Sequence, residues 1–414
     1  MNKTIKLAVA GAVLSAASMA NAGIIIPAGE WTMDINGNVN MYASFTNYDD
    51  DALVAGHLAG GKGASKTNDD NQTLGTGLLP AWLGFTGTTR QNDLDVSFTI
   101  SMQPNTSDNG TTGDTKGPLW RQAFLTFGDA SWGSVKMGKD LGIFAGNAIL
   151  ADMTLLGVGS NAAGSGQSTT LGGIGTGYIY PAWKGQITYT TPNMNGFQAK
   201  IGITNPNQFA DPNVRGAAAD GLVAAVTASK QDRFGLEGQA EYSFAMGKVW
   251  SSFASYEVTT GATDNISYDA TVIDLGATVN VGNAGITAYI YNGEGVGTTT
   301  FGGIFGGAPG GADAGVSAAG KTRDSSGGYI QGTYVIPTGT KLGVAYGVSN
   351  LDLASDESAS ALVVEENNRW TVGAYHPLTK HLNLVAEYNA MESTNQANTN
   401  AESQTVSLGA ILFF

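Results

Sequence analysis

The sequence predicts an all-β chain: a transmembrane antiparallel β-barrel of about 16 strands, with short periplasmic turns at one end and long extracellular loops at the other. Three observations predict it. Apolar and polar residues alternate with a period of two, short and long connections take turns along the chain, and few charged residues are combined with much glycine.

The alternation is clearest near the start of the chain. The odd positions from Trp31 to Phe45 form an apolar face, and the even positions from Thr32 to Thr46 form a polar one. A strand places alternate side chains on opposite faces, whereas a helix would mix the two sets. The pattern returns in residues 94–102, 197–204, 236–244, 273–281, 341–349 and 406–414. A water-soluble all-β protein is the alternative, but the small polar and charged residues of the polar face suit a wet lumen better than a packed core.

The connections between these segments alternate in length. The short ones are residues 88–93, 192–196, 245–248, 282–285, 337–340 and 376–380. The long ones are residues 49–77, 104–117, 205–233, 292–328, 350–367 and 390–401. Short turns on one side and long loops on the other are typical of outer-membrane barrels, and the hairpins amount to about 16 strands, an even number. Pairing all strands in a ring satisfies every backbone group at membrane depth.

Composition agrees with a barrel and excludes one class of partner. The chain has 59 glycines, no cysteine and only 13% charged residues, against about 25% in soluble domains. Without the two lysines of the export signal described next, 18 basic residues remain against 34 acidic ones, a net charge of −16. Nucleic-acid binding needs a basic surface, so we expect no nucleic-acid partner.

The first 22 residues have the three parts of an export signal. Lys3 and Lys6 precede an apolar run from Leu7 to Ala17, and Ala20-Asn21-Ala22 is an A-x-A cleavage site. We therefore expect a signal peptide at residues 1–22 and a mature barrel at residues 23–414. A helical anchor is the alternative, but the run is too short to span a bilayer.

Several motifs recur in an order that resembles one family. They are Leu83-Gly84-Phe85-Thr86-Gly87, Arg121-Gln122-Ala123-Phe124 with Trp132 to Lys139, Tyr189-Thr190-Thr191-Pro192 with Gly196-Phe197, Tyr375 to Lys380 with Glu387-Tyr388, and the terminal Phe414. In this order, which covers nearly the whole mature chain, they resemble the general trimeric porins of Gram-negative bacteria.

The resemblance implies a function and a set of partners. It implies a homotrimer in the cell outer membrane, in contact with lipid and lipopolysaccharide, with one pore per subunit for passive diffusion of small hydrophilic solutes and ions. It also implies that residues 141–177 fold into the lumen as a constriction loop. Two alternatives stay open: a solute-selective channel of the same fold, and a structural or adhesive outer-membrane barrel.

Family constrictions set acidic residues of the folded-in loop against basic residues of the wall, and the resulting field sets ion preference. The candidate constriction residues here are Asp152, Asp140, Arg121, Lys184 and Trp82. Asp152 is expected near the opening, opposite Arg121, because an arginine facing lipid would cost about 2–4 kcal/mol. Trp82 takes the place of a family arginine. Trp82, Trp120 and Trp183 fit either an aromatic girdle at the membrane interface or a stacking surface in the lumen.

The remaining charged residues of the polar face are interpreted as ordinary lumen wetting; they are Lys200, Glu237, Glu241, Asp274 and Glu387. The acidic balance predicts a modest cation preference. The loop at residues 141–177 is expected to set the narrowest point in preference to the glycine-rich loop at residues 292–328, because its apolar first half would be exposed on an outer loop.

Catalytic, metal and cofactor sites are not expected. The three histidines are His57 in a long connection and His376 and His381 beside a short turn, where a role as rim residues is the simplest. No zinc-protease motif, Cys/His set or phosphate loop is present. The run Asp49-Asp50-Asp51 is either solvated or bridges to lipopolysaccharide through divalent cations.

Overall fold

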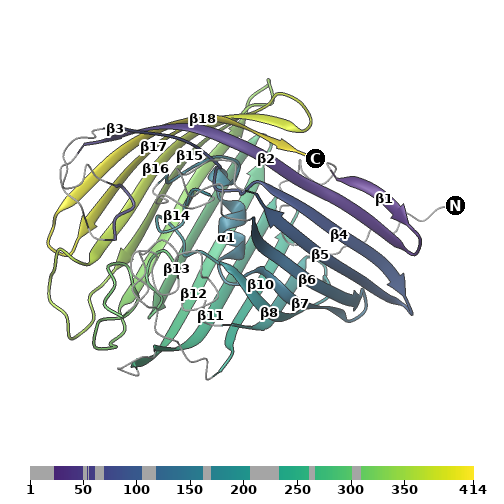
Figure 1. Ribbon diagram of the computed structural model, residues 1–414, viewed down its shortest axis with the longest axis horizontal. Coiled ribbons are helices and arrows are strands. Elements are labelled where there is room, and N and C mark those ends of the chain that lie inside the picture. Colours follow the sequence, from purple (N-terminus) through teal and green to yellow (C-terminus); the bar gives the residue numbers. More distant parts are fainter. Residues whose placement is uncertain are drawn as a thin grey trace.

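The computed structural model describes residues 23–49, 54, 56–60, 70–104, 118–161, 169–205, 233–260, 266–300 and 309–414. Its architecture is a closed antiparallel β-barrel of 16 strands, which confirms the predicted fold class (Figure 1). The sheet has 18 strands, but β1 (Ile24–Ala28) and β3 (Asp70–Gly75) are short and only extend neighbouring strands of the ring. The expected signal peptide, residues 1–22, lies outside the described residues.

The ring follows the chain without crossovers. Its strands are β2 (Trp31–Tyr48), β4 (Trp82–Gln91), β5 (Leu94–Gln103), β6 (Leu119–Asp129), β7 (Gly133–Leu141), β8 (Trp183–Thr190), β9 (Phe197–Thr204), β10 (Gly235–Phe244), β11 (Gly247–Thr260), β12 (Ile266–Val281), β13 (Ala284–Glu294), β14 (Asp324–Val335), β15 (Lys341–Leu351), β16 (Val364–Pro377), β17 (Leu382–Asn395) and β18 (Asn400–Phe413). Each pairs with its neighbours in sequence, and β18 pairs with β2 to close the ring.

Both ends of the described chain share one position in the ring. β18 pairs with the second half of β2, up to Phe413 opposite Asn38. β1 pairs with the first half of β2, from Ile24 opposite Ile35. β4 pairs with the opposite edge of the first half of β2. β1 therefore lies in line with β18 and fills the part of the wall that β18 does not reach.

The two faces of the wall have the composition that the alternation predicts. On β2 the outward Val39 is 53% exposed, whereas the inward Asn40 is 2% exposed. Inward hydroxyls pair across the closure, Ser44 with Ser407 at 2.8 Å and Thr46 with Thr405 at 2.9 Å. The apolar band therefore faces outward, and the polar side chains face the lumen.

The connections define two ends of the barrel, which we call the short-turn end and the long-loop end. One predicted long loop is wrong. β17 and β18 extend beyond the expected strand limits, so that only residues 396–399 connect them in place of the predicted 390–401. The side chain of Asn395 stabilises this tight turn because its Oδ1 accepts from the N–H groups of Ala397 and Thr399, both at 3.0 Å.

The described helices are short. They are α1 (Gly146–Ala151) and the 3-10 helix η2 (Met153–Leu156), both in the connection between β7 and β8. Within the described ranges, no helix is long and apolar enough to cross a membrane.

Candidate channel constriction

The connection between β7 and β8, residues 142–182, lies inside the barrel, and we call it the inner loop. Residues 142–161 and 169–182 of it are described. Figure 1 shows α1 within the ring of strands. The backbone of the loop is bonded to side chains of distant strands, including Gln331 of β14, which accepts from the N–H of Met153 at 2.9 Å, and Ser349 of β15, which accepts from that of Gly177 at 3.0 Å.

Apolar side chains explain why the inner loop folds inward. Phe144, Ala148 and Met153 are 0–3% exposed. They belong to one cluster with aromatic side chains on the inner face of the wall; these are Tyr42, Trp250, Tyr256, Tyr289, Tyr291, Tyr329 and Tyr375. Burial of such surface contributes about 25 cal/mol per Å². The inner face of the wall thus offers the loop an apolar surface in addition to polar acceptors for its backbone.

A buried carboxylate holds the start of the loop, and we call this group the near anchor. Glu237 of β10 accepts from the N–H groups of Ile143 at 2.6 Å and Phe144 at 3.0 Å. It is also paired with the ammonium of Lys184 and the hydroxyl of Tyr256. Lys184 in turn donates to Tyr256 at 2.6 Å, and both charged side chains are at most 1% exposed.

A second carboxylate holds the loop on the opposite side of the barrel, and we call this group the far anchor. Glu387 of β17 accepts from the N–H groups of Val158 at 2.9 Å and Gly159 at 2.8 Å, and from the hydroxyl of Tyr375 at 2.6 Å. Gly157 makes this approach possible, because a Cβ there would lie 1.9 Å from Glu387 Oε1.

Asp152 joins the two halves of the inner loop. Its Oδ1 accepts from the N–H of Thr154 at 2.9 Å at the start of η2. Its Oδ2 accepts from the N–H of Gly173 at 3.0 Å and from the hydroxyl of Tyr178 at 2.8 Å. The side chain is 6% exposed. Both oxygens are thus engaged within the loop, in contrast to the expected position at the opening.

Arg121, expected opposite Asp152, forms no ion pair or hydrogen bond with it in the described part of the chain. β5 and β6 pair Ser101 with Gln122 and Met102 with Trp120, so Arg121 is the extra residue of a β-bulge near the long-loop end. Its guanidinium lies 5.9 Å from the ring centroid of Trp183. Bulges of this kind follow from backbone pairing, which alternation alone cannot reveal.

The other three predicted residues have different surroundings. Lys184 belongs to the near anchor and is buried. Asp140 accepts from Gln122 at 3.0 Å and from Lys136 at 2.5 Å. Trp82 shares its face of β4 with the inward Gly84 and Thr86, and its indole N–H lies 3.4 Å from Asn36 Oδ1. Trp120, by contrast, is 55% exposed on the outer side.

Arg369 of β16 is the arginine that accompanies the inner loop, and the sequence analysis missed it. It is 3% exposed and donates to Thr371 at 2.7 Å and Thr176 at 3.3 Å. A Cβ at Gly159 would lie 2.8 Å from its Nη1. The signal was available, because Arg369 alternates with the outward Trp370 and Val372.

Other loops meet the inner loop at the long-loop end. The N–H of Tyr180 donates to the carbonyl of Thr299 at 2.8 Å. Leu58, 1% exposed, donates through its N–H to Asn367 and Ser393 of the wall, both at 3.0 Å. A Cβ at Gly175 would lie 2.6 Å from Leu58 and 2.5 Å from Thr299. The loop after β13 thus contacts the inner loop at this end.

These features together define a class. A closed ring with an apolar outer face, a polar inner face and a loop anchored inside is a transmembrane channel barrel. The chain matches the family model for Gram-negative porins over residues 7–396, and it belongs to that family. It is accordingly a channel for passive diffusion in the cell outer membrane, which confirms the resemblance found in the motifs.

Solved structures show the same fold at low identity. The outer membrane channel DcaP of Acinetobacter baumannii is 16% identical, with a TM-score of 0.68 over 95% of this chain and 100% of that one. OmpF of Salmonella typhi in complex with daunomycin is 14% identical, with a TM-score of 0.58 over 94% and 100%. OmpT of Vibrio cholerae in its trimer form is 15% identical, with a TM-score of 0.56 over 93% and 99%. No curated protein matches the chain.

Proposed function

We propose that small hydrophilic solutes and ions diffuse through the lumen of this barrel and that the inner loop, expected from the sequence at residues 141–177, sets its narrowest part. The observation that carries the proposal is the pair of anchors. Glu237 and Glu387 hold the loop from two sides of the ring, so the loop crosses the lumen and narrows it. We further propose that the protein is a homotrimer surrounded by outer-membrane lipid and lipopolysaccharide and has no catalytic activity.

The charges support a modest cation preference at the outer entrance. Among the described residues, acidic side chains outnumber basic ones at the long-loop end; the acidic ones are Asp49, Asp70, Asp140, Glu257, Asp269, Glu294, Asp313, Asp324, Asp352, Asp356, Glu357, Glu365, Glu366, Glu392 and Glu402, and the basic ones are Arg121, Lys139, Lys184, Arg233, Lys321 and Arg323. A field of one sign enriches its counter-ions and weakens with salt.

Positions of the histidines support the absence of catalysis. His57 Nδ1 accepts from the N–H of Gly60 at 3.0 Å at the long-loop end. His376 Nδ1 lies 2.9 Å from Thr340 Oγ1 at the short-turn end. Because a base must reach a nucleophile, His57 and His376, which lie at opposite ends of the barrel and are engaged locally, do not form a shared catalytic group.

Conductance in planar bilayers tests the proposal. We expect a stable ohmic conductance per subunit, and in a KCl gradient a reversal potential of the sign for cation preference that shrinks as salt rises. A non-conducting protein would support a structural or adhesive barrel instead. Native mass spectrometry tests assembly, where monomers at all concentrations would contradict the trimer.

A further inference from the structure

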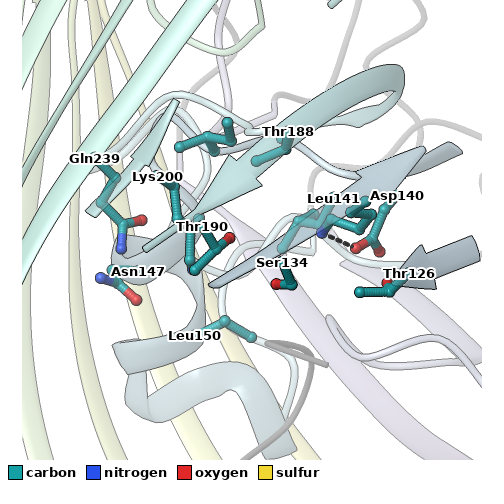
Figure 2. Close-up of a pocket in the computed structure, with 14 residues that line it drawn as sticks. Thr126, Ser134, Asp140, Leu141, Asn147, Leu150, Thr188, Thr190, Lys200 and Gln239 are labelled. Atoms are coloured by element: carbon teal, nitrogen blue, oxygen red, sulfur yellow. Dashed lines mark hydrogen bonds and ion pairs between the residues drawn. The ribbon is translucent and has the colours of Figure 1, made fainter. Parts of the chain in front are cut away.

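A pocket lies between the inner loop and the wall, on the short-turn side of α1. Its wall consists of inward side chains of five consecutive strands, β6 to β10, and α1 contributes Gly146, Asn147 and Leu150. Figure 2 shows Lys200 beside Thr190, its partner in register on β8, with Asn147 and Gln239 nearby. The pocket thus lies along the surface that a solute meets when it passes the inner loop.

Three lysines from alternate strands lie at or beside this pocket, and two of them, Lys136 and Lys200, line it. They are Lys136 of β7, Lys200 of β9 and Lys248 of β11, all close to the short-turn end. Lys136 is paired with Asp140 at 2.5 Å. Lys248 donates to Asn147 Oδ1 at 3.0 Å and lies 5.2 Å from the ring centroid of Trp250. Two of the three ammonium groups therefore have a fixed acceptor or ring partner.

Lys200 is different. Within the described part of the chain its ammonium makes no hydrogen bond and no ion pair, although its side chain is only partly exposed and lines the pocket. The charges that act on it are those of Glu241, Lys136, Lys248 and Asp140. Glu241 Oε2 is already engaged by Asn147 at 3.0 Å and Gln239 at 3.1 Å. An ammonium in such a place is available to an incoming acceptor.

The charge and size of the pocket select the kind of acceptor. Among the lining residues two lysines, Lys136 and Lys200, stand against one carboxylate, Asp140, which leaves a surplus of one positive charge. The pocket has a cavity volume of about 40 Å³. Since one water occupies about 10–15 Å³ of such a volume, the space suits a group of a few heavy atoms. Leu150 and Ile143 add apolar lining for a short aliphatic chain.

We propose that this pocket is a transient binding site for small carboxylates, with the Lys200 ammonium as the main contact of the carboxylate oxygens. The proposal deepens the proposed function and rests on it, because the ligand reaches the pocket through the lumen. A carboxylate forms charge-assisted hydrogen bonds that are roughly twice as strong as neutral ones. Uncharged solutes of the same size pass the site without that attraction.

Propionate and propionamide are matched probes, because they have nearly the same shape and differ in charge. In planar bilayers, propionate added at the short-turn side should increase current noise and reduce the potassium current in a saturable way, and propionamide should do neither. Equal effects of the two compounds would overturn the proposal.

Variants of the full chain test the contact. Lys200→Met keeps the length of the side chain and should raise the half-blocking concentration of propionate about tenfold, equivalent to about 1.4 kcal/mol. Glu241→Gln removes a repelling charge and should lower it. Lys380→Met, in an exposed turn at the same end, is the control and should have no effect. An unchanged value in Lys200→Met, or equal shifts in Lys200→Met and Lys380→Met, would contradict the site.

A binding measurement separates this proposal from the channel itself. Saturation-transfer NMR on the methyl protons of propionate detects contact with the detergent-solubilised protein whether or not it conducts. Binding that is lost in Lys200→Met supports the site even if no conductance is found, in which case only the proposed function fails. Conductance without a binding difference between Lys200→Met and the unaltered protein overturns the site alone.

Discussion

The near and far anchors hold the same loop by the same kind of bond, but their surroundings differ. At the near anchor Glu237 faces a buried cation, Lys184, as well as two N–H groups and Tyr256. At the far anchor the hydrogen-bond donors to Glu387 are all neutral: two N–H groups and the hydroxyl of Tyr375. The near anchor is therefore an ion pair that also accepts hydrogen bonds from the loop. The far anchor is a carboxylate whose hydrogen bonds come only from the loop and from Tyr375.

This difference predicts that the near anchor affects mainly the stability of the barrel and the far anchor mainly the position of the inner loop. A buried ion pair costs most when one partner is removed, because the other charge is left unpaired. The near anchor thus links β8, β10 and β11 of the wall and is needed by the barrel itself. Loss of the far anchor breaks no ion pair, so we expect it to change the position of the loop more than the stability of the wall.

The largest expected effect is that of Glu237→Ala. Lys184 would remain buried without its partner, and the free energy of unfolding should fall by about 3–5 kcal/mol. Urea unfolding in lipid vesicles, followed by tryptophan fluorescence, measures this change. The double variant Lys184→Met/Glu237→Leu removes both charges and should recover much of the loss. Equal losses in the single and double variants would show that the ion pair is not the cause.

A smaller effect is expected for Glu387→Gln. Bonds to a charged acceptor contribute about 1.5–3 kcal/mol, and their loss should free residues 157–159 of the inner loop. Single-channel recordings should then show a higher or more variable conductance, while the barrel remains folded. A conductance identical to that of the unaltered protein would show that the far anchor does not position the constriction.

Gly157→Ala tests the same anchor from the side of the loop. The new Cβ would meet Glu387 Oε1 at 1.9 Å, so the carboxylate and the loop must separate. We expect the conductance phenotype of Glu387→Gln, with little further change when the two substitutions are combined. Gly146→Ala in α1 is the control, because a Cβ there meets no atom within 4 Å. Additive effects of the two substitutions would mean that they act at separate places.

The smallest effect concerns a third carboxylate, which lies in an outer loop. Glu357 binds Arg323 through two bonds, at 2.6 and 2.8 Å, and the hydrogen bond to Arg323 lowers the pKa of Glu357. A lowered pKa contributes stability above the unfolded value, and this stability is lost as pH falls through the folded value. Hydrogen exchange of residues 352–363 should therefore accelerate below the usual glutamate pKa of about 4.3. Glu357→Gln should exchange quickly at neutral pH as well, and a pH dependence that persists in it would assign the effect to another group.

The alternation of apolar and polar residues was sufficient to predict most of the fold but little of the site. It identified the faces of β2, β10 and β12, because outward side chains meet lipid and inward ones meet water or the loop. It could also place Glu237 and Glu387 on the inner face. Their role could not be predicted, because it depends on which loop backbone comes to lie against them. From the sequence, these two residues are interpreted as ordinary charged residues of a water-filled lumen, whereas both accept hydrogen bonds from the inner loop.

Arg121 and Asp152 show two other limits of the sequence. A bulge displaces Arg121 from the regular register, and nothing in a single sequence marks where two strands slip. Asp152 was expected at the opening because it is the acid of the loop, yet a carboxylate in a compact loop is also the best acceptor for its N–H groups. The local donors of the loop, the N–H groups of Thr154 and Gly173 and the hydroxyl of Tyr178, therefore hold Asp152 within the loop.

The wall position shared by β1 and β18 has a consequence for the time course of folding. Its side-chain pair Ser44–Ser407 joins residues 363 positions apart, so this seam is the longest-range contact in a wall otherwise made of neighbours in sequence. Loop closure of that length carries a large entropic barrier. Hairpins can form early and in any order, but the cylinder closes only when the two ends of the chain meet, and we expect that encounter to be the slow step of assembly.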